Sequence, residues 1–547
     1  MSASGKRTGI FFAILLAMLC AALIFRLIYT QWILPAPFYA YYDPEMAYYF
    51  SSLAYLKGAP LVYIDHPGTP VEILGALIFL STYPLTHWLG VSFFGYHLSH
   101  PEIFLTLART FITLTSLLTL IFLAFTFWRR RNLPNALLAG SLAVLYFTLH
   151  PLALNLAVAW SHNAFNFPLG TLLLILLYRA VREERQTYLR EIILLGAATG
   201  FLTAITIYFA TWIIGFGLTF SLLALLRKEG MLKAALAAFL TGISSLAGFC
   251  LATLPIASSY PQFARWVIRL LIHQDRYGSG EIGMVPADLM IERLQDLSHQ
   301  GPWIGLGILL AFFLLLVVLR HQKNSLSWNK GVFAYILAVM VQLIFTVLVV
   351  AKHPALIYLL AGVAILPPLI GAEFEFLESF KPVTPALSIV FSLIILAFFA
   401  RTWILSLDEH SNRVLSFAQS QQAIEARLTR LSAELGKTPE NLEVLSTYGI
   451  YDGCFARWFG NDYSAGALGT QIREVCPHDT SLNVFTGYVN TGSQSIPLSE
   501  SNWDVILIRS DIFTSRKLNF GVNYRIEESA VQFPGNYGPV LFITPIR

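Results

Sequence analysis

Charged side chains are scarce in this chain. Of its 547 residues, 36 are Lys or Arg and 32 are Asp or Glu. Charged residues therefore make up 12%, about half of the share that is usual in soluble globular proteins. Hydrophobic residues make up 56%, and the mean hydropathy is +0.62. Because a water-facing surface has to be covered with polar groups, this composition excludes a soluble enzyme and an intrinsically disordered protein. A net charge of +4 is too small to favour a nucleic acid as partner, so the sequence predicts a membrane protein.

Cysteine is also rare, with four residues in the whole chain. Cys20 and Cys250 fall within apolar stretches, where a cysteine is most simply a small packing residue. Cys454 and Cys476 both fall in the C-terminal part of the chain. In an oxidising exterior compartment, a Cys454–Cys476 disulfide is expected. No Cys/His spacing resembles a structural zinc site, so the sequence leaves the identity of any metal site unknown.

Long stretches without Asp, Glu, Lys or Arg predict membrane-spanning helices. A helix needs roughly 20 residues to cross a hydrocarbon core about 30 Å thick. The charge-free stretch 132–178 therefore holds two crossings with a turn near His150, and 192–226 holds two with a turn near Tyr208. The first apolar stretch runs to about Tyr29, which is too long for a cleaved signal peptide and indicates a retained span. Eleven spans are expected: 8–29, 103–128, 134–150, 164–180, 191–207, 209–226, 232–255, 301–320, 331–351, 355–372 and 384–406.

Basic residues in short loops predict the orientation of these spans. The positive-inside rule places the loops that carry them on the cytoplasmic side. Since Lys6–Arg7 and Arg129–Arg131 are both expected inside, an even number of crossings should separate them. The apolar segment 71–95 is therefore expected to lie at the outer face, as an interfacial or re-entrant segment. An odd number of spans then places the C-terminus outside. The basic loops are 129–131, 179–190, 227–233 and 320–330.

The expected fold is an α-helical polytopic membrane protein with a small α+β exterior domain. Residues 1–407 form the transmembrane part, with outer loops at 30–102 and 256–300. Residues 408–547 have ordinary soluble composition and form the second domain. This tail begins with a helical stretch, 409–436, and continues with strand-like pieces such as Val505–Ile508 and Val540–Ile543. The expected location is the inner (plasma) membrane, with a periplasmic or extracellular C-terminal domain.

The placement of the polar residues points to chemistry at the outer surface. In transporters, ionisable residues lie in the middle of spans and line the pathway. Here the span middles are nearly free of them, and Arg26 lies near a span end, from which it is expected to reach the interface. The acidic residues of the first half gather in the first outer loop. They are Asp43, Glu45, Asp65 and Glu72.

Asp43 begins a pattern that is typical of a helix start. Asp43 stands at the N-cap, Pro44 follows at the first helical position, and Glu45 lies in the first turn. One interpretation is therefore a helix cap with no further role. The alternative is a binding site, because the loop is rich in tyrosine, and aromatic rings beside carboxylates suit the hydroxyls and ring faces of sugars.

At these residues the chain resembles the polytopic lipid-dependent glycosyltransferases of the GT-C fold. That group includes the protein O-mannosyltransferases and the aminoarabinose transferase that acts on lipid A. The resemblance covers roughly residues 1–407. The second outer loop, Ala159–Ala164, differs from the family pattern because it carries His162 but no carboxylate. The similar features are the motif Asp43-Pro44-Glu45, the turn Asp65–Pro70, the loop His273–Gly280 and the outer-face Lys352-His353-Pro354 followed by Tyr358.

The resemblance implies a role for each of these residues. Asp43 would act as base or acceptor orienter, with Glu45 supporting it or binding acceptor or metal. Four residues would bind the donor phosphate: Lys352, His353, Arg276 and Tyr358. Six further residues would contact substrate: Tyr42, Asp65, His66, His162, His273 and Tyr277. No cofactor is certain, and a divalent metal is left open.

Plain structural interpretations compete with several of these roles. Lys352 is explained equally by a membrane anchor whose ammonium reaches the interface. His353 has a second interpretation as an ordinary interfacial histidine. Asp65 and His66 would then only cap a Pro-Gly turn, and residues 278–280 would only supply a flexible turn.

The sequence therefore predicts a membrane glycosyltransferase that uses a polyprenyl-phosphate-linked sugar at the outer face of the bilayer. The resemblance suggests inversion at the anomeric carbon. Its partners would be the lipid-linked donor, the bilayer and a glycan, lipid or protein acceptor. A transporter or flippase of lipid-linked glycans is the main alternative, and it predicts a charged central cavity and an inverted repeat. A non-catalytic scaffold whose tail binds a partner is a third interpretation.

Overall fold

The computed structural model describes most of the chain. The described ranges are 3–61, 68–128, 132–183, 188–274, 280–283, 285–300, 329–378, 385–447, 450, 452–483, 487–490, 495–516, 518–532 and 539–546.

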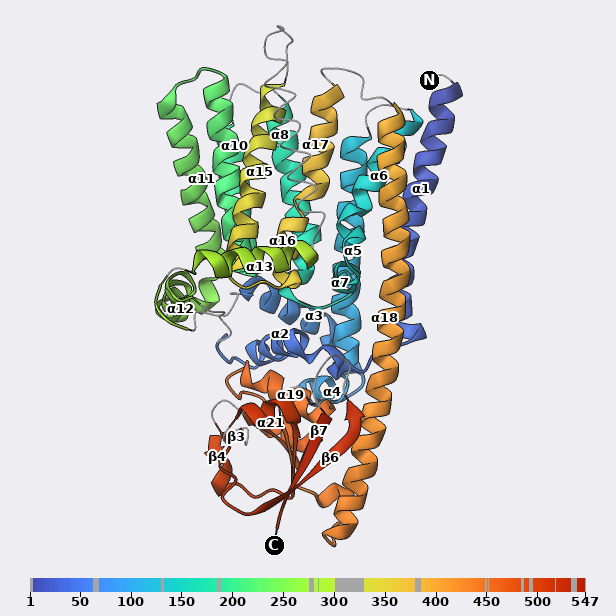
Figure 1. Ribbon diagram of the computed structural model, residues 1–547, viewed down its shortest axis with the longest axis vertical. Coiled ribbons are helices and arrows are strands. Elements are labelled where there is room, and N and C mark those ends of the chain that lie inside the picture. The colour runs from blue at the N-terminus through green and yellow to red at the C-terminus, as the bar shows by residue number, and fades with distance from the viewer. Residues whose placement is uncertain are drawn as a thin grey trace. The chain divides into compact units, whose positions relative to one another are not determined.

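The chain folds as a helical membrane protein (Figure 1). Within the described residues, nine helices are long and apolar enough to cross a membrane. Eight of them overlap predicted spans, and the ninth is Thr69–Trp88. The predicted span 134–150 corresponds to a shorter apolar helix, and 301–320 lies outside the described residues. The predicted span 191–207 corresponds to the 17-residue helix Leu189–Ile205, which is not among the nine. The eight are Lys6–Ile33, Pro101–Phe127, His162–Arg182, Ile207–Leu226, Met231–Ala252, Lys330–Ala351, Leu356–Leu377 and Pro385–Glu434.

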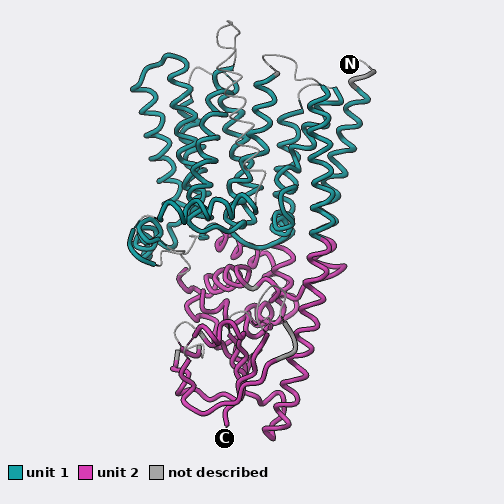
Figure 2. Tube along the Cα trace, in the orientation of Figure 1, with its two compact units in different colours: residues 1–27, 64–70, 109–406 teal, residues 28–63, 71–108, 407–547 magenta. Residues whose placement is uncertain are grey.

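Two compact units make up the chain (Figure 2). Unit 1 contains residues 1–27, 64–70 and 109–406, and unit 2 contains 28–63, 71–108 and 407–547. The break at 406 falls beside the predicted domain boundary. However, most of the predicted first outer loop groups with the tail, whereas the sequence assigned it to the transmembrane part.

Close packing inside unit 2 explains this grouping. The loop helix α2 (Tyr42–Leu56) packs against the tail helix α19 (Gly453–Asp462). Gly460 makes the contact possible, because a Cβ at that position would lie 2.3 Å from the Phe50 ring and 2.8 Å from the Met46 carbonyl oxygen. Local sequence patterns do not reveal this contact, since it joins segments about 400 residues apart.

Unit 1 is built almost entirely from helices, and large aromatic side chains such as Trp160, Trp212 and Tyr335 are fully buried in it. Between the regular helices lie short irregular turns, which include η4 (His162–Phe165), the π-helical η5 (Asn166–Thr171), η6 (Ile207–Thr211) and η7 (Leu254–Ser259). The helices are α1 (Ala3–Ile28), α5 (Pro101–Phe127), α6 (Leu133–Val144), α7 (Pro151–Leu156), α8 (Leu172–Arg182), α9 (Leu189–Ile205), α10 (Trp212–Leu226), α11 (Met231–Ala252), α12 (Tyr260–Ile272), α13 (Ala287–Gln300), α15 (Lys330–Ala351), α16 (Leu356–Val363) and α17 (Leu366–Glu378).

Helix α18 (Pro385–Glu434) runs through 50 residues. The sequence predicted a final span at 384–406 and a separate tail helix at 409–436. The segment between them, 401–410, contains neither Pro nor Gly, so nothing in it breaks the helix.

In the described part of unit 2, helices pack against a sheet of seven strands. Its strand order is β4-β3-β2-β1-β5-β7-β6, with β1 parallel to both β2 and β5. The predicted strands near 505–508 and 540–543 are β5 and β7. The helices are α2, α3 (Thr69–Trp88), α4 (Phe93–Ser99), α19 and α20 (Gly469–Val475), with the short α21 (Ser510–Ser515). The strands are β1 (Val444–Thr447), β2 (Asp479–Asn483), β3 (Tyr488–Asn490), β4 (Ser495–Pro497), β5 (Val505–Arg509), β6 (Tyr524–Gln532) and β7 (Pro539–Pro545).

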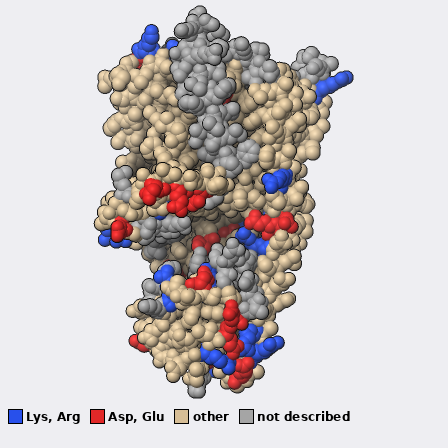
Figure 3. Space-filling view, viewed as in Figure 1, with Lys and Arg blue, Asp and Glu red and all other residues tan. Residues whose placement is uncertain are grey.

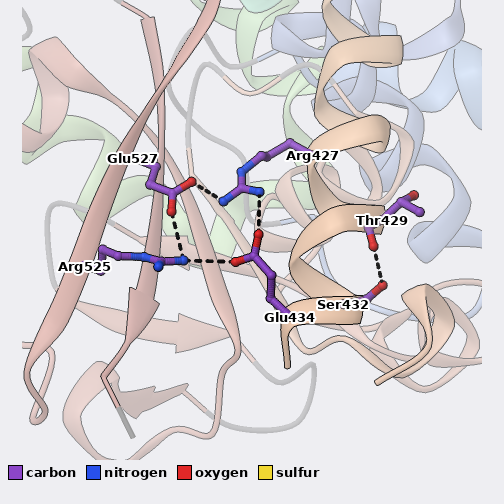
Figure 4. Close-up of polar contacts among 6 residues, drawn as sticks. All are labelled: Arg427, Thr429, Ser432, Glu434, Arg525 and Glu527. Atoms are coloured by element: carbon purple, nitrogen blue, oxygen red, sulfur yellow. Dashed lines mark hydrogen bonds and ion pairs between the residues drawn. The ribbon is translucent and has the colours of Figure 1, made fainter. Parts of the chain in front are cut away.

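The end of α18 covers one face of this sheet. Ile424 and Leu431 join the apolar cluster that includes Val444 and Val505. Figure 4 shows polar contacts that add to this packing at the edge strand. Arg427 contacts both Glu434 and Glu527, and Arg525 lies 3.1 Å from Glu434 and 2.8 Å from Glu527. Such half-exposed pairs contribute little singly, so the apolar contacts hold the helix in place.

Helix α3 is the segment that the sequence placed at the outer face. By length and composition it is able to cross a membrane. In unit 2, its Phe79 stacks on Phe104 at a ring distance of 4.1 Å and meets the rings of Tyr49 and His97 edge-on. Because these contacts do not place the bilayer, the outer-face assignment stays a prediction.

Cys454 and Cys476 form the predicted disulfide, with their Cα atoms 5.8 Å apart. It joins the start of α19 to the residue that follows α20. Replacing both cysteines by serine is expected to destabilise unit 2 by about 3 kcal/mol, because the bond closes a loop of about 20 residues in the unfolded chain. Pulse proteolysis of the full chain in urea measures the change. The control, Cys20→Ser with Cys250→Ser, removes the two free cysteines, and equal urea midpoints for both pairs would contradict the prediction.

Asp479, at the start of β2, makes the stability of unit 2 depend on pH. Burial, with the nearby charges of Asp452 and Glu443, raises the pKa of Asp479 to about 7. An unfolded aspartate titrates at about 3.9, so across the window between these values the folded chain holds a proton that the unfolded chain has released. Stability therefore falls as the pH rises through that window. Asp479→Asn is expected to raise the unfolding temperature at about pH 8 and to leave it unchanged at about pH 4.

A second aspartate provides a control of opposite sign. Arg509 donates hydrogen bonds of 3.0 and 2.5 Å to Asp511 and lowers the pKa of that carboxyl. Asp511→Asn should therefore lower the unfolding temperature at the higher pH. A shift for Asp479→Asn that is the same at both pH values would refute the assignment.

Candidate functional site

Asp43 stands at the start of α2. Its φ of −105° and ψ of 115° are not helical, so the regular helix begins at Pro44. An extended residue before a helix has the conformation of an N-cap. Helix α2 nevertheless starts one residue before Asp43, at Tyr42, with Asp43 at a kink, so the predicted cap at Asp43 stays a prediction. Asp43 is exposed.

The other acidic residues of this loop are in different environments. Glu45 is 1% exposed and therefore does not face solvent beside Asp43. Glu72, in the first turn of α3, is fully buried near Ser51 of α2. Asp65 and His66 lie outside the described residues, as does the Tyr42 side chain. Among the described acidic residues of this loop up to Glu72, Asp43 alone is exposed.

Aromatic residues precede Asp43 and hold the loop to α18 within unit 2. The Tyr39 hydroxyl donates a hydrogen bond to Gln421. Burial and the charges of Asp452 and Glu425 raise the pKa of Tyr39 to about 12, so this hydroxyl stays protonated. The Arg413 guanidinium lies over the Tyr41 ring, 5.0 Å from its centre. The backbone leading to Asp43 is therefore fixed from the tail side.

Lys352 has a structural partner in unit 1. Its ammonium donates hydrogen bonds to the carbonyl oxygens of Leu270 and Leu271, the latter at 3.1 Å, at the end of α12. Burial, with the nearby charge of Arg293, lowers the pKa of Lys352. A lysine at the last carbonyls of a helix is a C-terminal cap. The ammonium is thus engaged with protein carbonyls, which weakens its predicted role at a donor phosphate.

His353 and Tyr358 lie together. Their rings meet edge-on at 4.8 Å, and Tyr358 also stacks on Tyr208 at 4.8 Å. Tyr358 is 8% exposed. The arrangement is an aromatic cluster at the start of α16, and an apolar cluster of this kind packs against rings and chains more readily than against a bare phosphate.

His273 lies at one end of the predicted outer loop of unit 1. Its Nδ1 is 2.8 Å from the carbonyl oxygen of Gly280, and Gln274 N donates to Glu281 O at 3.0 Å. Arg293 donates to the carbonyl oxygens of Gln274 and Lys352, so the base of the loop is tied to Lys352. Arg276 and Tyr277 lie outside the described residues.

His162 belongs to a buried polar segment. It is 4% exposed, and its Nε2 is 2.9 Å from the Asn163 side-chain nitrogen. Asn166, three residues after Asn163, is fully buried at the start of the π-helical η5. The short helices η4 and η5 pack against α16, so His162 lies on the element next to Tyr358. In this structure His162 is therefore not accessible to a soluble acceptor.

Arg26 was misjudged from the sequence. It does not extend to the interface but is 1% exposed, and its Nη2 donates to Asn155 Oδ1 of α7 at 2.5 Å. Arg109 of α5 is also buried, at 6% exposure. One turn further along α5, Thr113 donates to the carbonyl oxygen of Ala157, just after α7. Both guanidiniums are thus buried, and a buried ionisable residue in a span is a signal of function that the sequence already contained.

The spans also contain buried polar groups that the sequence underrated. Gln342, within α15, and Glu373, within α17, are both fully buried. The sequence expectation concerned ionisable residues in span middles, and Glu373 lies near the end of its candidate span, Leu356–Leu377. Among the described residues, no three His, Cys, Asp or Glu side chains gather in a way that would hold a metal ion.

Comparison with known proteins does not identify the chain. No protein-family model matches it, and no curated protein matches it significantly in sequence. The assignment of function therefore depends on the site residues themselves.

Proposed function

We propose that this chain is a membrane glycosyltransferase. It moves a sugar from a polyprenyl-phosphate carrier to an acceptor at the outer face of the membrane. The observation that carries the proposal is the exposed Asp43 carboxylate at the non-helical start of α2, in a chain of membrane-spanning helices.

The reaction needs an acceptor group, a base that takes its proton and a cation beside the leaving phosphate. An acceptor oxygen or nitrogen forms a bond to the anomeric carbon of the sugar, and the bond from that carbon to the phosphate oxygen breaks. The acceptor proton passes to the Asp43 carboxylate, and polyprenyl phosphate leaves with the bonding electrons. A fixed cation stabilises the leaving phosphate.

The resemblance implies Lys352 and Arg276 for that cation. Lys352 caps α12, so Arg276, which lies outside the described residues, is the candidate that is left. His353 and Tyr358 then supply an aromatic wall, which suits a sugar or prenyl chain.

A transporter or flippase of lipid-linked glycans is the second candidate. The buried Gln342 and Glu373 favour it, because intramembrane polar groups often line a pathway. The two functions differ in chemistry, since a flippase leaves its lipid-linked substrate intact.

An assay in detergent distinguishes a transferase from a flippase. Without a sealed membrane there are no two sides for a flippase to move lipid between, whereas a transferase still releases product. Lipid extract from cells that lack this chain supplies the accumulated donor, and the membranes of those cells supply the acceptor. The purified chain should release free polyprenyl phosphate, detected by mass spectrometry, and the Asp43→Asn variant should not. Release by neither protein, from an extract that contains the lipid-linked sugar, would exclude the transferase.

A further inference from the structure

Helix α12 is an exposed helix attached to a candidate span. None of its residues is buried. It follows α11 through the short turn η7, and α11 is long and apolar enough to cross a membrane. Figure 1 shows α11 along its length and α12 nearly end-on, so α12 lies across the end of α11 rather than extending it. A helix that lies across the end of a candidate span has the arrangement typical of membrane-surface helices.

One side of α12 packs against α11, within unit 1. The Phe263 ring stacks on Phe249 of α11 at 5.6 Å and lies 5.9 Å from the Trp266 ring. At its far end, Leu270 and Leu271 offer their carbonyl oxygens to Lys352. The helix is therefore held at both ends, and its rotation about its own axis is fixed.

The remaining surface of α12 has two flanks of different chemistry. The first is apolar and consists of Ile268, Leu271 and Ile272, which are 51%, 73% and 42% exposed. The second is cationic and consists of Arg265 and Arg269, four residues apart and both exposed. At 3.6 residues per turn the two flanks lie side by side along the helix. The described part of α12 carries no acidic residue.

The elements next to α12 also differ in chemistry, with exposed leucines on one and acidic side chains on another. On the α11 side, Leu251 and Leu254 are 75% and 65% exposed, so the apolar flank continues the lipid-facing surface of a candidate span. Helix α13, in the same predicted loop, carries Asp288, Glu292 and Asp296 at four-residue spacing. Figure 3 shows acidic side chains gathered over α13. An anionic surface would repel α13 and attract α12.

We infer that α12 is a membrane-surface helix that binds anionic lipid. Its apolar flank enters the acyl region of the leaflet at the C-terminal end of α11, and Arg265 and Arg269 contact phosphate-bearing headgroups. The Lys352 cap positions the helix for this contact. The inference does not require the chain to be a glycosyltransferase, and it gives Lys352 a positioning role in place of donor binding.

The depth of α12 is testable by spin labelling of the full chain. The background carries Cys20→Ser and Cys250→Ser, so that only an introduced cysteine reacts. A nitroxide is attached at Leu271→Cys on the apolar flank or at Gln262→Cys beside the arginines, and the protein is reconstituted into phosphatidylcholine vesicles. We expect the label at 271 to be relaxed by oxygen, which dissolves in lipid, and the label at 262 by a water-soluble nickel chelate.

Two outcomes would overturn the inference. Relaxation of both labels by the nickel chelate would place α12 in water. Protection of the label at 271 from both reagents would indicate a protein contact on the apolar flank.

The cationic flank is tested by adding phosphatidylglycerol to the vesicles. The label at 271 should move deeper, and Arg265→Gln with Arg269→Gln should abolish this response. Each arginine should contribute about fivefold to the apparent affinity for the anionic lipid. Arg401→Gln, at an exposed arginine of α18 in the same unit, is the matched control and should leave the response unchanged. A response that survives loss of both arginines would show that they do not bind the headgroups.

Discussion

Replacing Gly200 by leucine is expected to abolish the folded state of unit 1. Gly200 lies where α9 and α11 touch, and a Cβ at this position would lie 1.8 Å from the Ser245 carbonyl oxygen. A Cβ on Gly248, across the contact, would lie 2.0 Å from the Ala197 carbonyl oxygen. The two backbones therefore meet directly, as in membrane helix pairs that place small residues at the interface.

The close contact also supports a hydrogen bond across the pair. Ser245 Oγ donates to the carbonyl oxygen of Gly196 at 2.9 Å. Moving the helices apart to admit a side chain would break this bond and empty the space around it. Overpacking typically costs about 1–3 kcal/mol, and leucine here would force two backbones apart, which places the cost at or above the top of that range.

Gly242 provides the control for Gly200→Leu. It lies in the same helix, α11, and a Cβ there would meet nothing within 4 Å. Gly242→Ala should leave the yield of monodisperse protein in gel filtration unchanged, because alanine favours helix more than glycine does. Gly200→Leu should give no monodisperse peak, and Gly200→Ala should give a lowered unfolding temperature. Normal yield and stability for Gly200→Leu would mean that α9 and α11 are not packed as described.

The helical part of the fold follows from local features of the sequence. Apolar runs such as 232–255 and 331–351 predicted α11 and α15 within a few residues, because a span is encoded in its own length and hydropathy. The runs 134–150 and 355–372 each correspond to more than one helical element. There the chain forms irregular turns, such as the one between α16 and α17, which hydropathy alone does not reveal.

The tail was predicted in its pieces but not in its topology. Val505–Ile508 and Val540–Ile543 read as strands because they are apolar and β-branched. Their antiparallel pairing as β5 and β7, and the parallel pairing of β1 with both β2 and β5, depend on contacts distant in sequence. The Cys454–Cys476 bond was predictable because only two cysteines fall in the tail.

Only those features of the candidate site that depend on local sequence could be predicted. Asp43 could be placed at a helix start, since N-cap preference is local. The engagement of Lys352 with α12 could not be foreseen, because it joins segments some 80 residues apart through backbone carbonyls, which every residue carries. Arg26 could have been noticed, because an arginine in an apolar span is costly unless the protein provides a partner.

Replacing Asp43 by asparagine is expected to lower turnover between about 100-fold and 10,000-fold while the protein stays folded. Asparagine keeps the shape of the side chain and removes its charge, so it cannot take a proton from the acceptor. Turnover is measured as polyprenyl phosphate released per folded protein in detergent, and the unfolding temperature is measured on the same sample.

This substitution separates catalysis from helix capping, the two interpretations of Asp43. Asparagine caps a helix as well as aspartate does, so a residue that only caps α2 would tolerate the change with full activity and unchanged stability. A proton acceptor would lose turnover at unchanged stability. Glu102→Gln is the matched control, because Glu102 is an exposed carboxylate in the same predicted loop, 3.3 Å from His100, and its loss should affect neither quantity. Turnover at the wild-type level in Asp43→Asn would leave Asp43 as a cap and remove the base from the proposed reaction.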